Sequence, residues 1–234
     1  MTTSVTITDH ELPDETHNLY TVTVSVAGDP APSSPTTFTC LLTNSPTHLT
    51  DWLAALPLPP PGPTKTIVGL DVEWRPNRSP RDDHPIATLQ LHLLETHSVV
   101  FQILHSPTIP EALTEFLNDE RLVFVGVGIE EDIEKLVCDY GVSMKAEVRD
   151  LRTGEGTKGL GLTGLAKRVL GMDVVKNKRV GMSRWDMFWL NSDQVKYACF
   201  DAFLSWKIGE ALLNDDARLD WSKPLVAFFA VGEA

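Results

Sequence analysis

The sequence predicts an α/β fold in which a mixed β-sheet is flanked by helices. Short segments rich in apolar and β-branched residues recur along the chain, which is typical of buried strands. Amphipathic segments with a helical period separate the later of these strands. Two strand-like segments, 86–94 and 98–104, are joined by a short turn and therefore suit an antiparallel pair. Strands that then alternate with helices favour a sheet with helices on its faces.

The N-terminal part of the chain predicts a β-hairpin ahead of the main fold. Residues 1–17 are polar and acidic, and we expect them to be disordered or loosely attached. Strand-like segments at 19–28 and 37–43 follow, and the turn-rich sequence GDPAPSSP separates them. The residue pattern leaves open whether this hairpin extends the main sheet or packs elsewhere.

A short helix and a stiff linker connect the hairpin to the rest of the chain. In segment 45–58, Ser45 or Thr47 can cap a helix that places its leucines and a tryptophan on one side. The sequence PLPPPGP at 57–63 excludes a helix or a central strand, because proline lacks the N–H donor. We therefore divide the chain into an N-terminal segment at 1–63, a main domain at 64–215 and a C-terminal tail at 216–234.

The main domain contains segments of strand character and segments of helix character. The expected strands are 66–74, 86–94, 98–104, 122–128 and 148–151. The expected helices are 110–120, 129–141, 162–171 and 192–215. Typical boundary residues support the helices, with proline near the start of the first, glycine after the second and Ser192 as the cap of the last.

The composition is that of a globular protein with a sizeable core. Hydrophobic residues make up 42% and charged residues 22% of the chain, and no apolar stretch is long enough for a transmembrane helix. The polar start lacks the basic and apolar parts of a signal peptide. The three cysteines, Cys40, Cys138 and Cys199, are far apart, which argues against a disulfide framework or a zinc site. We expect an intracellular location, in the nucleus, the cytoplasm or both.

The charge distribution is uneven. The net charge is −12, which by itself argues against a nucleic-acid partner. Between Lys145 and Arg184, however, ten Lys or Arg residues stand against four Asp or Glu residues, a local balance of +6 that leaves −18 for the remainder. This stretch is either a solvated face with a chance excess of basic residues or a basic approach surface beside an acidic metal site. Both interpretations stay open.

Two carboxylates interrupt the apolar strand at 66–74. Asp71 and Glu73 are two residues apart, so the period of a strand places both side chains on the same face. Adjacent carboxylates repel each other unless a cation lies between them. A divalent metal would serve well, because hard cations bind oxygen ligands. Basic residues close in sequence could also serve: Lys65, Arg75 and Arg78.

Two further carboxylates have the spacing to join this pair. Asp132 follows the strand at 122–128 through a glycine-containing turn, although an acid at a helix start also has a purely structural use. Tyr197 and Asp201 are four residues apart and therefore share a face of the last helix. Four converging carboxylates suit two Mg²⁺ or Mn²⁺ ions, which activate a water and stabilise the charge on a phosphate. A tyrosine hydroxyl beside them can orient the attacking water.

These motifs resemble those of a known family. The segments Leu70–Trp74, Val125–Asp132 and Tyr197–Ala202 are similar to the three exonuclease motifs of the DEDD superfamily, whose members have an RNase H-like fold. The resemblance is greatest to plant Werner syndrome-like exonuclease domains, and it covers residues 64–213, near two-thirds of the chain. The bulky pair Cys199–Phe200 departs from the small residues common in the third motif, and we interpret it as helix packing.

The resemblance implies a 3′→5′ exonuclease with two Mg²⁺ or Mn²⁺ ions. Asp71 would bridge both ions. Glu73 and Asp201 would hold the ion that activates water, and Asp132 would support the second ion through water. Tyr197 would position the nucleophile. A sister subclass has histidine in that place, but all seven histidines lie in the first half of the chain, so only the tyrosine subclass (DEDDy) fits.

Other residues are candidates for contacts with a nucleic-acid strand. Trp74 could stack on a terminal base, or it could close the core. Basic residues before the last helix could bind phosphates, or they could belong to a plain solvated loop: Lys176, Lys178, Arg179 and Arg184. The aromatic residues of the same stretch are expected to anchor it to the core: Trp185, Phe188 and Trp189.

The predicted reaction releases nucleoside 5′-monophosphates from single-stranded or 3′-overhanging ends, and both DNA and RNA stay open as substrates. The resemblance implies a helicase partner or an RNA-silencing partner, since no helicase segment is present and plant relatives act on DNA or on RNA in small-RNA complexes. Some of those relatives form rings, so a homo-oligomer also stays open, whereas no membrane partner is expected. The alternative function is a nucleic-acid-binding or protein-interaction module in which catalysis is dispensable.

Overall fold

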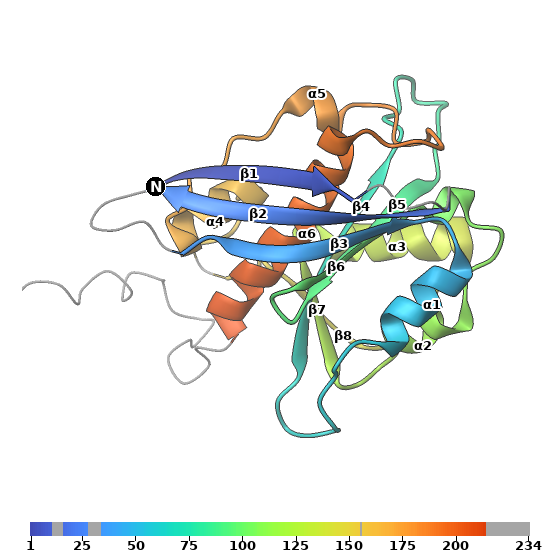
Figure 1. Cartoon of the computed structure of the whole chain (residues 1–234), viewed down its shortest axis with the longest axis horizontal. Helices are drawn as coiled ribbons and strands as arrows, with labels where there is room; N and C mark the ends of the chain where they lie inside the picture. The colour runs from blue at the N-terminus through green and yellow to red at the C-terminus, as the bar shows by residue number, and fades with distance from the viewer. Residues whose placement is uncertain (11–15, 28–33, 155, 214–234) are drawn as a thin grey trace, which may run out of the picture.

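Strand β4 (Thr66–Trp74) lies near the centre of an eight-stranded mixed sheet in the computed structural model, which describes residues 1–10, 16–27, 34–154 and 156–213. It pairs antiparallel with β5 (Ile86–Leu93) and parallel with β7 (Leu122–Gly126). The other strands are β1 (Thr2–Asp9), β2 (His17–Ala27), β3 (Thr36–Thr43), β6 (His97–Phe101) and β8 (Glu147–Asp150). Their order in the sheet is β1-β2-β3-β6-β5-β4-β7-β8 (Figure 1). The predicted mixed sheet and all five strands of the main domain are confirmed.

The N-terminal strands extend this sheet. The predicted hairpin is formed by β2 and β3, and β3 pairs parallel with β6, so the question left open by the sequence is answered. The expectation of disorder for residues 1–17 is wrong for β1, which pairs antiparallel with β2 from Thr2↔Ala27 to Asp9↔Tyr20. Half-buried and exposed residues alternate along most of this strand, and this places Val5 and Ile7 against the core. Residues 11–15 of that prediction lie outside the described part of the chain.

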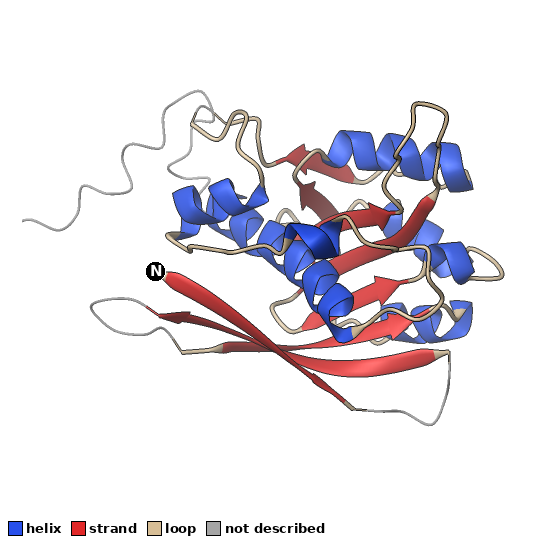
Figure 2. Ribbon diagram, turned by 90° about the horizontal axis from the view of Figure 1, so that it is seen from above, coloured by secondary structure: helices blue, strands red, loops and turns tan. Residues whose placement is uncertain are grey.

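Helices lie on both faces of the sheet (Figure 2). One face packs against α4 (Leu162–Leu170) and α6 (Ser192–Leu213), and the core on this side includes Tyr20 and Val22 of β2. The other face packs against α1 (Pro46–Ala54), α2 (Glu111–Leu117) and α3 (Ile129–Tyr140). The N-terminal strands therefore share a core with the rest of the chain, while the proposed division at 63/64 stays a prediction. The predicted tail at 216–234 lies outside the described residues.

Two details near α6 differ from the sequence-based expectation. Its N-cap is Asn191 and not Ser192, because Asn191 Oδ1 accepts a hydrogen bond from Gln194 N at 3.0 Å while Gln194 Oε1 accepts one from Asn191 N at 3.2 Å. This reciprocal pair satisfies two backbone donors at once. The stretch before α6 is also more ordered than expected, since it contains the short helix α5 (Lys178–Gly181), capped by Asn177.

Helix α6 approaches β4 closely at Gly69. A β-carbon at this position would lie 2.6 Å from Trp206 N and 2.9 Å from Trp206 Cβ, and closer still to the carbonyl oxygen of Ala202. A second small residue, Gly209, plays the same part further along α6, where a β-carbon would lie 2.8 Å from Val125 Cγ2 of β7. Glycine is therefore required at Gly69 for the helix to rest on the strand. Cys40 of β3 and Cys199 of α6 are buried free thiols, and they donate to Leu41 O at 3.9 Å and to Lys196 O at 3.4 Å, respectively.

Helix α1 also contributes to the core. Its N-cap is Ser45, one of the two predicted candidates, and Ser45 Oγ accepts a hydrogen bond from His48 N at 3.3 Å. Leu49 and Leu53 of this helix are buried. A 3-10 turn at Ile103–His105 replaces the end of the strand expected at 98–104. None of the helices in the described ranges combines the length and the apolar character that a membrane span needs.

We expect Gly69→Ala to destabilise the protein by about 3 kcal/mol or more, because backbone atoms of α6 cannot move away from the added methyl group without separating helix and sheet. Urea denaturation measures the change. Gly62→Ala is the matched control, since its β-carbon would find nothing nearer than Pro60 O at 3.8 Å. Equal midpoints for the two variants would contradict this account of the packing.

Candidate active site

The carboxylates of Asp71, Glu73 and Asp201 come together where α6 crosses the end of β4. Val68, Leu70 and Val72 point to the face that carries α1, α2 and α3, so the alternating residues Asp71 and Glu73 point to the α6 face. Asp201 precedes Ala202, whose carbonyl lies against Gly69. Carboxylate oxygens of the three residues lie within 4.8 Å of one another. The close contact at Gly69 thus brings the third acid to the other two.

The fourth predicted acid, Asp132, lies at the edge of this group. Strand β7 runs parallel to β4, and a β-carbon on Gly126 would lie 2.9 Å from Leu70 O, so the end of β7 is held against the residue before Asp71. Gly128 then turns the chain with a φ of 79° and begins α3, whose first turn carries Asp132. The charge of Asp132 reaches Asp71 and Glu73, but Asp132 is not one of the three acids within 4.8 Å.

Burial and mutual repulsion dominate the electrostatics of the site. Burial, followed by the charges of Asp201 and Asp132, raises the pKa of Asp71 well above its ordinary value. Burial and the neighbouring Asp71 do the same to the pKa of Glu73. Burial also raises the pKa of Asp201 to about 6 and the pKa of Asp132 to about 7. Burial therefore disfavours the ionised form of all four acids, and repulsion by neighbouring site acids adds to this at Asp71 and Glu73.

Lys176 supplies one positive charge to this group. Its ammonium forms an ion pair and hydrogen bond with Asp201 Oδ2, and it lies 4.9 Å from the centre of the Tyr197 ring. Burial opposes the ammonium form, but the charges of Asp201 and Asp71 outweigh it and raise the pKa of Lys176. Two basic residues close in sequence to Asp71 do not pair with the site carboxylates: Lys65 forms an ion pair with Glu147, and Arg75 forms one with Asp186.

Tyr197 is held beside the carboxylates with its hydroxyl protonated. Burial, followed by the charge of Asp201, raises the pKa of Tyr197 to about 12. Its ring lies 6.0 Å from that of the buried Trp185. Gly181 of α5 faces the hydroxyl so closely that a β-carbon there would lie 2.8 Å from Tyr197 Oη. At neutral pH this hydroxyl can orient a hydrogen-bonding partner and cannot act as a base.

The donor set fits a divalent metal. The three clustered side chains offer carboxylate oxygens, the ligands that Mg²⁺ and Mn²⁺ prefer. Asp201 Oδ1 is buried and has no hydrogen-bond partner among the described residues, although Oδ2 of the same side chain is paired. A buried, unpartnered carboxylate oxygen is costly unless a cation approaches it. Asp71, Glu73 and Asp201 are therefore the residues that could hold such an ion, with Asp132 beside them.

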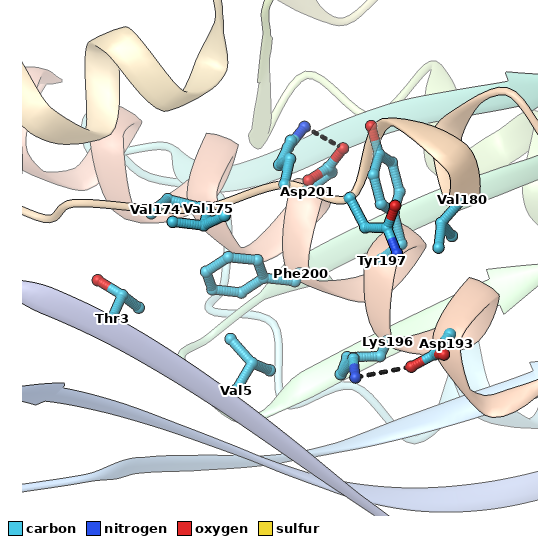
Figure 3. A pocket seen from close by; sticks show the side chains of 12 residues that line it. Thr3, Val5, Val174, Val175, Val180, Asp193, Lys196, Tyr197, Phe200 and Asp201 are labelled. Carbon is cyan, nitrogen blue, oxygen red and sulfur yellow. Dashed lines mark hydrogen bonds and ion pairs between the residues drawn. The ribbon is translucent and has the colours of Figure 1, made fainter.

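A pocket of about 250 Å³ opens next to Tyr197 and Asp201 (Figure 3). Phe200 and the valines at 174 and 175 form apolar walls, and β1 contributes Thr3 and Val5. Thr3 is held there because its N–H donates to Asp173 O at 3.0 Å. The N-terminal strand therefore borders the candidate site.

The residues predicted to contact a nucleic-acid strand lie in three kinds of surroundings: against the core, inside the carboxylate group and on the surface. Trp74 is half-buried and packs against the core, with Lys135 Nζ 5.7 Å from its ring centre. Lys176 lies inside the carboxylate group and not in an open loop. Three basic residues are exposed: Lys178, Arg179 and Arg184.

The expectation that the aromatic residues before α6 are anchors is right for one of the three. Trp185 is buried, and its Nε1 donates to Gly181 O at 3.1 Å. Phe188 and Trp189 are 44% and 64% exposed, so the expectation is wrong for them. The reason is that other groups already fix this stretch: the side chain of Gln102 donates to Phe188 O at 2.9 Å.

Several positioning residues escaped the sequence analysis. Asp150, at the end of β8, accepts a hydrogen bond from Gly128 N at 3.0 Å and pairs with Arg152, which fixes the turn before Asp132. Gly181 limits the position of Tyr197. The one available signal for Asp150 was its place at the carboxyl end of a predicted strand, where parallel strands gather their side chains. Nothing in the sequence around Gly181 indicated its contact.

Comparison with known proteins gives consistent matches. Residues 47–215 match the model of a family described as 3′-5′ exonuclease. A 3′-5′ exonuclease of Arabidopsis thaliana is 36% identical over 151 residues, which cover 62% of this chain and 52% of the relative. The bifunctional 3′-5′ exonuclease/ATP-dependent helicase WRN of Mus musculus is 33% identical over 159 residues, 65% of this chain and 11% of the relative. The chain thus spans about half the length of the first relative and a small part of the second.

Solved structures share the fold. Escherichia coli RNase D, an exoribonuclease involved in structured RNA processing, superposes with a TM-score of 0.59 at 17% identity over 75% of this chain and 45% of that chain. The EXO domain of Aedes aegypti Nibbler gives 0.58 at 17% identity over 77% and 90%. At this identity the likeness concerns the fold alone, which is the RNase H-like fold that the sequence motifs implied.

The site carboxylates should destabilise the metal-free protein as the pH rises through their pKa values. Because their pKa values are raised in the folded state, folded protein holds more protons than unfolded protein above about pH 4. This stabilisation is fully present below about pH 4 and lost as the pH rises through about 6 to 7. We expect the site carboxylates to contribute a decrease on the order of 2 kcal/mol in the free energy of unfolding, measured by urea denaturation in a chelator.

Asp71→Asn should flatten this pH dependence and abolish the stabilisation that Mg²⁺ or Mn²⁺ gives to the wild type near pH 8. Asp51→Asn, at an exposed position of α1, is the control and should behave as the wild type. Carboxylates whose pKa is lowered by arginine, such as Asp186, act below about pH 4. Burial lowers the pKa of His92 to about 3, so His92 stabilises the folded protein as the pH rises from about 3 to 6.5. Both proteins contain His92, so the difference between their profiles reports on the site carboxylates. Identical profiles for wild type and Asp71→Asn would rule out the repulsion described above.

Proposed function

The chain belongs to the 3′-5′ exonuclease family, and from this premise we propose that it hydrolyses nucleic acid from the 3′ end to nucleoside 5′-monophosphates. The substrate is a single strand or a 3′ overhang. The observation that carries the proposal is the convergence of Asp71, Glu73 and Asp201 within 4.8 Å, on the face of the sheet where α6 presents Tyr197.

Two Mg²⁺ or Mn²⁺ ions are the proposed cofactors. Asp71, Glu73 and Asp201 would hold them, with Asp132 as an outer support, and when bound the ions supply an activated water and neutralise charge on the phosphate. The unpartnered Asp201 Oδ1 and the raised pKa of each acid support this assignment. Four acids that repel one another have little structural use, which disfavours a module in which catalysis is dispensable.

The protein's own groups orient the reacting atoms. Tyr197 keeps its proton at neutral pH, so its hydroxyl positions the attacking water by hydrogen bonding, as in the tyrosine subclass. Gly181 and Trp185 hold the ring in place. The ammonium of Lys176 lies beside Asp201, where it can donate a hydrogen bond to a phosphate oxygen of the strand and form an ion pair with it.

The setting of the reaction is also a proposal. The helicase in the name of the WRN relative supports a partner that supplies single strands, and an RNA-silencing partner is the corresponding proposal for an RNA substrate. We place the protein inside the cell, in the nucleus, the cytoplasm or both. Digestion of matched RNA and DNA strands, with the size of the protein measured by light scattering, tests the substrate and the homo-oligomer together.

With Mg²⁺ or Mn²⁺, a 5′-labelled single strand of 12 nucleotides should give a ladder of products shortened from the 3′ end. Asp71→Asn should lower kcat by about 10³-fold or more, because it removes a ligand and a charge from the centre of the site. Tyr197→Phe should lower kcat by about 10²-fold, the usual effect of losing one orienting hydrogen bond. Asp51→Asn should leave kcat as it is. A ladder unchanged by both Asp71→Asn and Asp201→Asn would falsify the proposal.

Gly181→Ala should lower kcat by about tenfold or more without unfolding the protein, because the methyl group displaces the Tyr197 hydroxyl from a 2.8 Å contact. Combining it with Tyr197→Phe should add little, since both changes act on the same hydroxyl. Gly164→Ala is the matched control, because its β-carbon would meet only the flexible Leu160 side chain at 3.5 Å. Additive losses in the double variant would show that Gly181 acts elsewhere.

A further inference from the structure

A groove of about 430 Å³ runs between the segment that follows β4 and the segment that precedes α6. Arg75 and Arg78 line it from the first segment, and Arg184 and Trp189 line it from the second. Gln194, one turn before Tyr197 on α6, also lines it. Arg75 follows Glu73 by two residues and Gln194 precedes Tyr197 by three, so two elements of the carboxylate site also contribute to the groove.

The segment 182–189, here called the platform segment, displays apolar side chains to solvent. Met182 is 67% exposed, Met187 46%, Phe188 44% and Trp189 64%. Single exposed apolar residues are ordinary on a protein surface, but four within eight residues form a patch. These side chains lie beside a groove lined by arginines, which is an unusual setting for a patch without a partner.

The backbone of the platform segment is nevertheless firmly held. The buried Gln102 donates from Nε2 to Phe188 O at 2.9 Å, and the buried Gln194 donates from Nε2 to Arg184 O at 3.3 Å. His105 Nε2 lies 3.2 Å from Asp186 O. The exposure of the apolar side chains is therefore built into the fold and does not come from a loosely attached loop. Preorganised aromatic side chains bind ligands with a small entropic cost.

The groove carries positive charge on a protein whose net charge is −12. Arg75 and Arg184 both pair with Asp186, which fixes their guanidinium groups and leaves other N–H donors available. Arg78 has no ion-pair partner in the described part of the chain. Asp82 Oδ2 accepts hydrogen bonds from the backbone N–H groups of Arg78 and Ser79 at 2.9 and 3.0 Å. Three arginines against Asp186 and Asp82 still leave a positive balance, which suits phosphate groups.

We propose that this groove binds the single strand on the 5′ side of the nucleotide being removed. A base of the strand stacks on Trp189, with Met182 beside it, and the phosphates contact Arg75 and Arg78. Stacking and phosphate contacts do not depend on sequence, so the groove grips any strand that is unpaired. This inference rests on the proposed function, because a strand in the groove is useful only if its 3′ end reaches the carboxylate site.

Two substrates of different length separate the groove from the catalytic centre. The p-nitrophenyl ester of thymidine 5′-monophosphate reaches only the centre, whereas a 12-nucleotide single strand also reaches the groove. For Trp189→Ala and Arg78→Ala we expect kcat/KM on the strand, relative to kcat/KM on the ester, to fall about tenfold each. Val137→Ala, exposed on α3, and Arg168→Ala, exposed on α4, are the matched controls and should keep the wild-type ratio.

The outcomes of this experiment distinguish the two proposals. Hydrolysis of both substrates with wild-type ratios in Trp189→Ala and Arg78→Ala overturns the groove and leaves the exonuclease in place. If neither substrate is hydrolysed, the proposed function fails, and anisotropy of a fluorescein-labelled strand on Asp71→Asn, with and without the groove substitutions, still decides the groove. If Trp189→Ala changes the oligomeric size seen by light scattering but not the ratio, the patch is a contact between copies and the strand proposal is wrong.

Discussion

The close contact between α6 and β4 at Gly69 is the constraint on which the site depends. No side chain separates helix and strand there, and the next residues of each element on the shared face, Asp201 on the helix and Asp71 on the strand, meet as a result. A larger residue at this point would lift α6 and carry Tyr197 and Asp201 away from Asp71 together. Packing of the core and assembly of the site are therefore the same event, since close-packed interiors transmit small displacements.

The carboxylates show how a site can be costly to the fold that contains it. Burial and repulsion raise the pKa of Asp71 and Glu73 well above their ordinary values, and Lys176 offsets only part of the repulsion. A structural role alone would be served better by uncharged residues. Surrounding groups keep the site in place despite this repulsion. Asp150 fixes the turn before Asp132, and Gly181 restricts the position of the Tyr197 hydroxyl. Clusters of residues with strongly perturbed pKa values are typical of functional sites.

The elements outside the matched family region still contribute to the site. The family match begins at residue 47, after β3 has ended, yet β1 to β3 continue the same sheet and share the core beneath α6. Thr3 and Val5 of β1 reach the pocket beside Tyr197, and β1 is hydrogen-bonded to Asp173, three residues before Lys176. The N-terminal strands are thus part of the surroundings of the reacting groups and not an appendage.

The sequence by itself determined the elements and the identities of the acids. Hydrophobic period predicted the strands of the main domain and all of its α-helices except the short α5 to within a few residues, because a buried face imposes its period on the residues. The order of the motifs around Asp71 indicated the candidate acids. The alternation in β1 could not be recognised from the sequence, because only Val5 and Ile7 are apolar among its threonines and Ser4. Only the tertiary structure decided that Lys176 lies against Asp201, that Gly181 touches Tyr197, and that Trp185 is buried while Trp189 is exposed. These are contacts between segments that the packing of α5 and α6 brings together, and no local pattern records which distant groups will share a space.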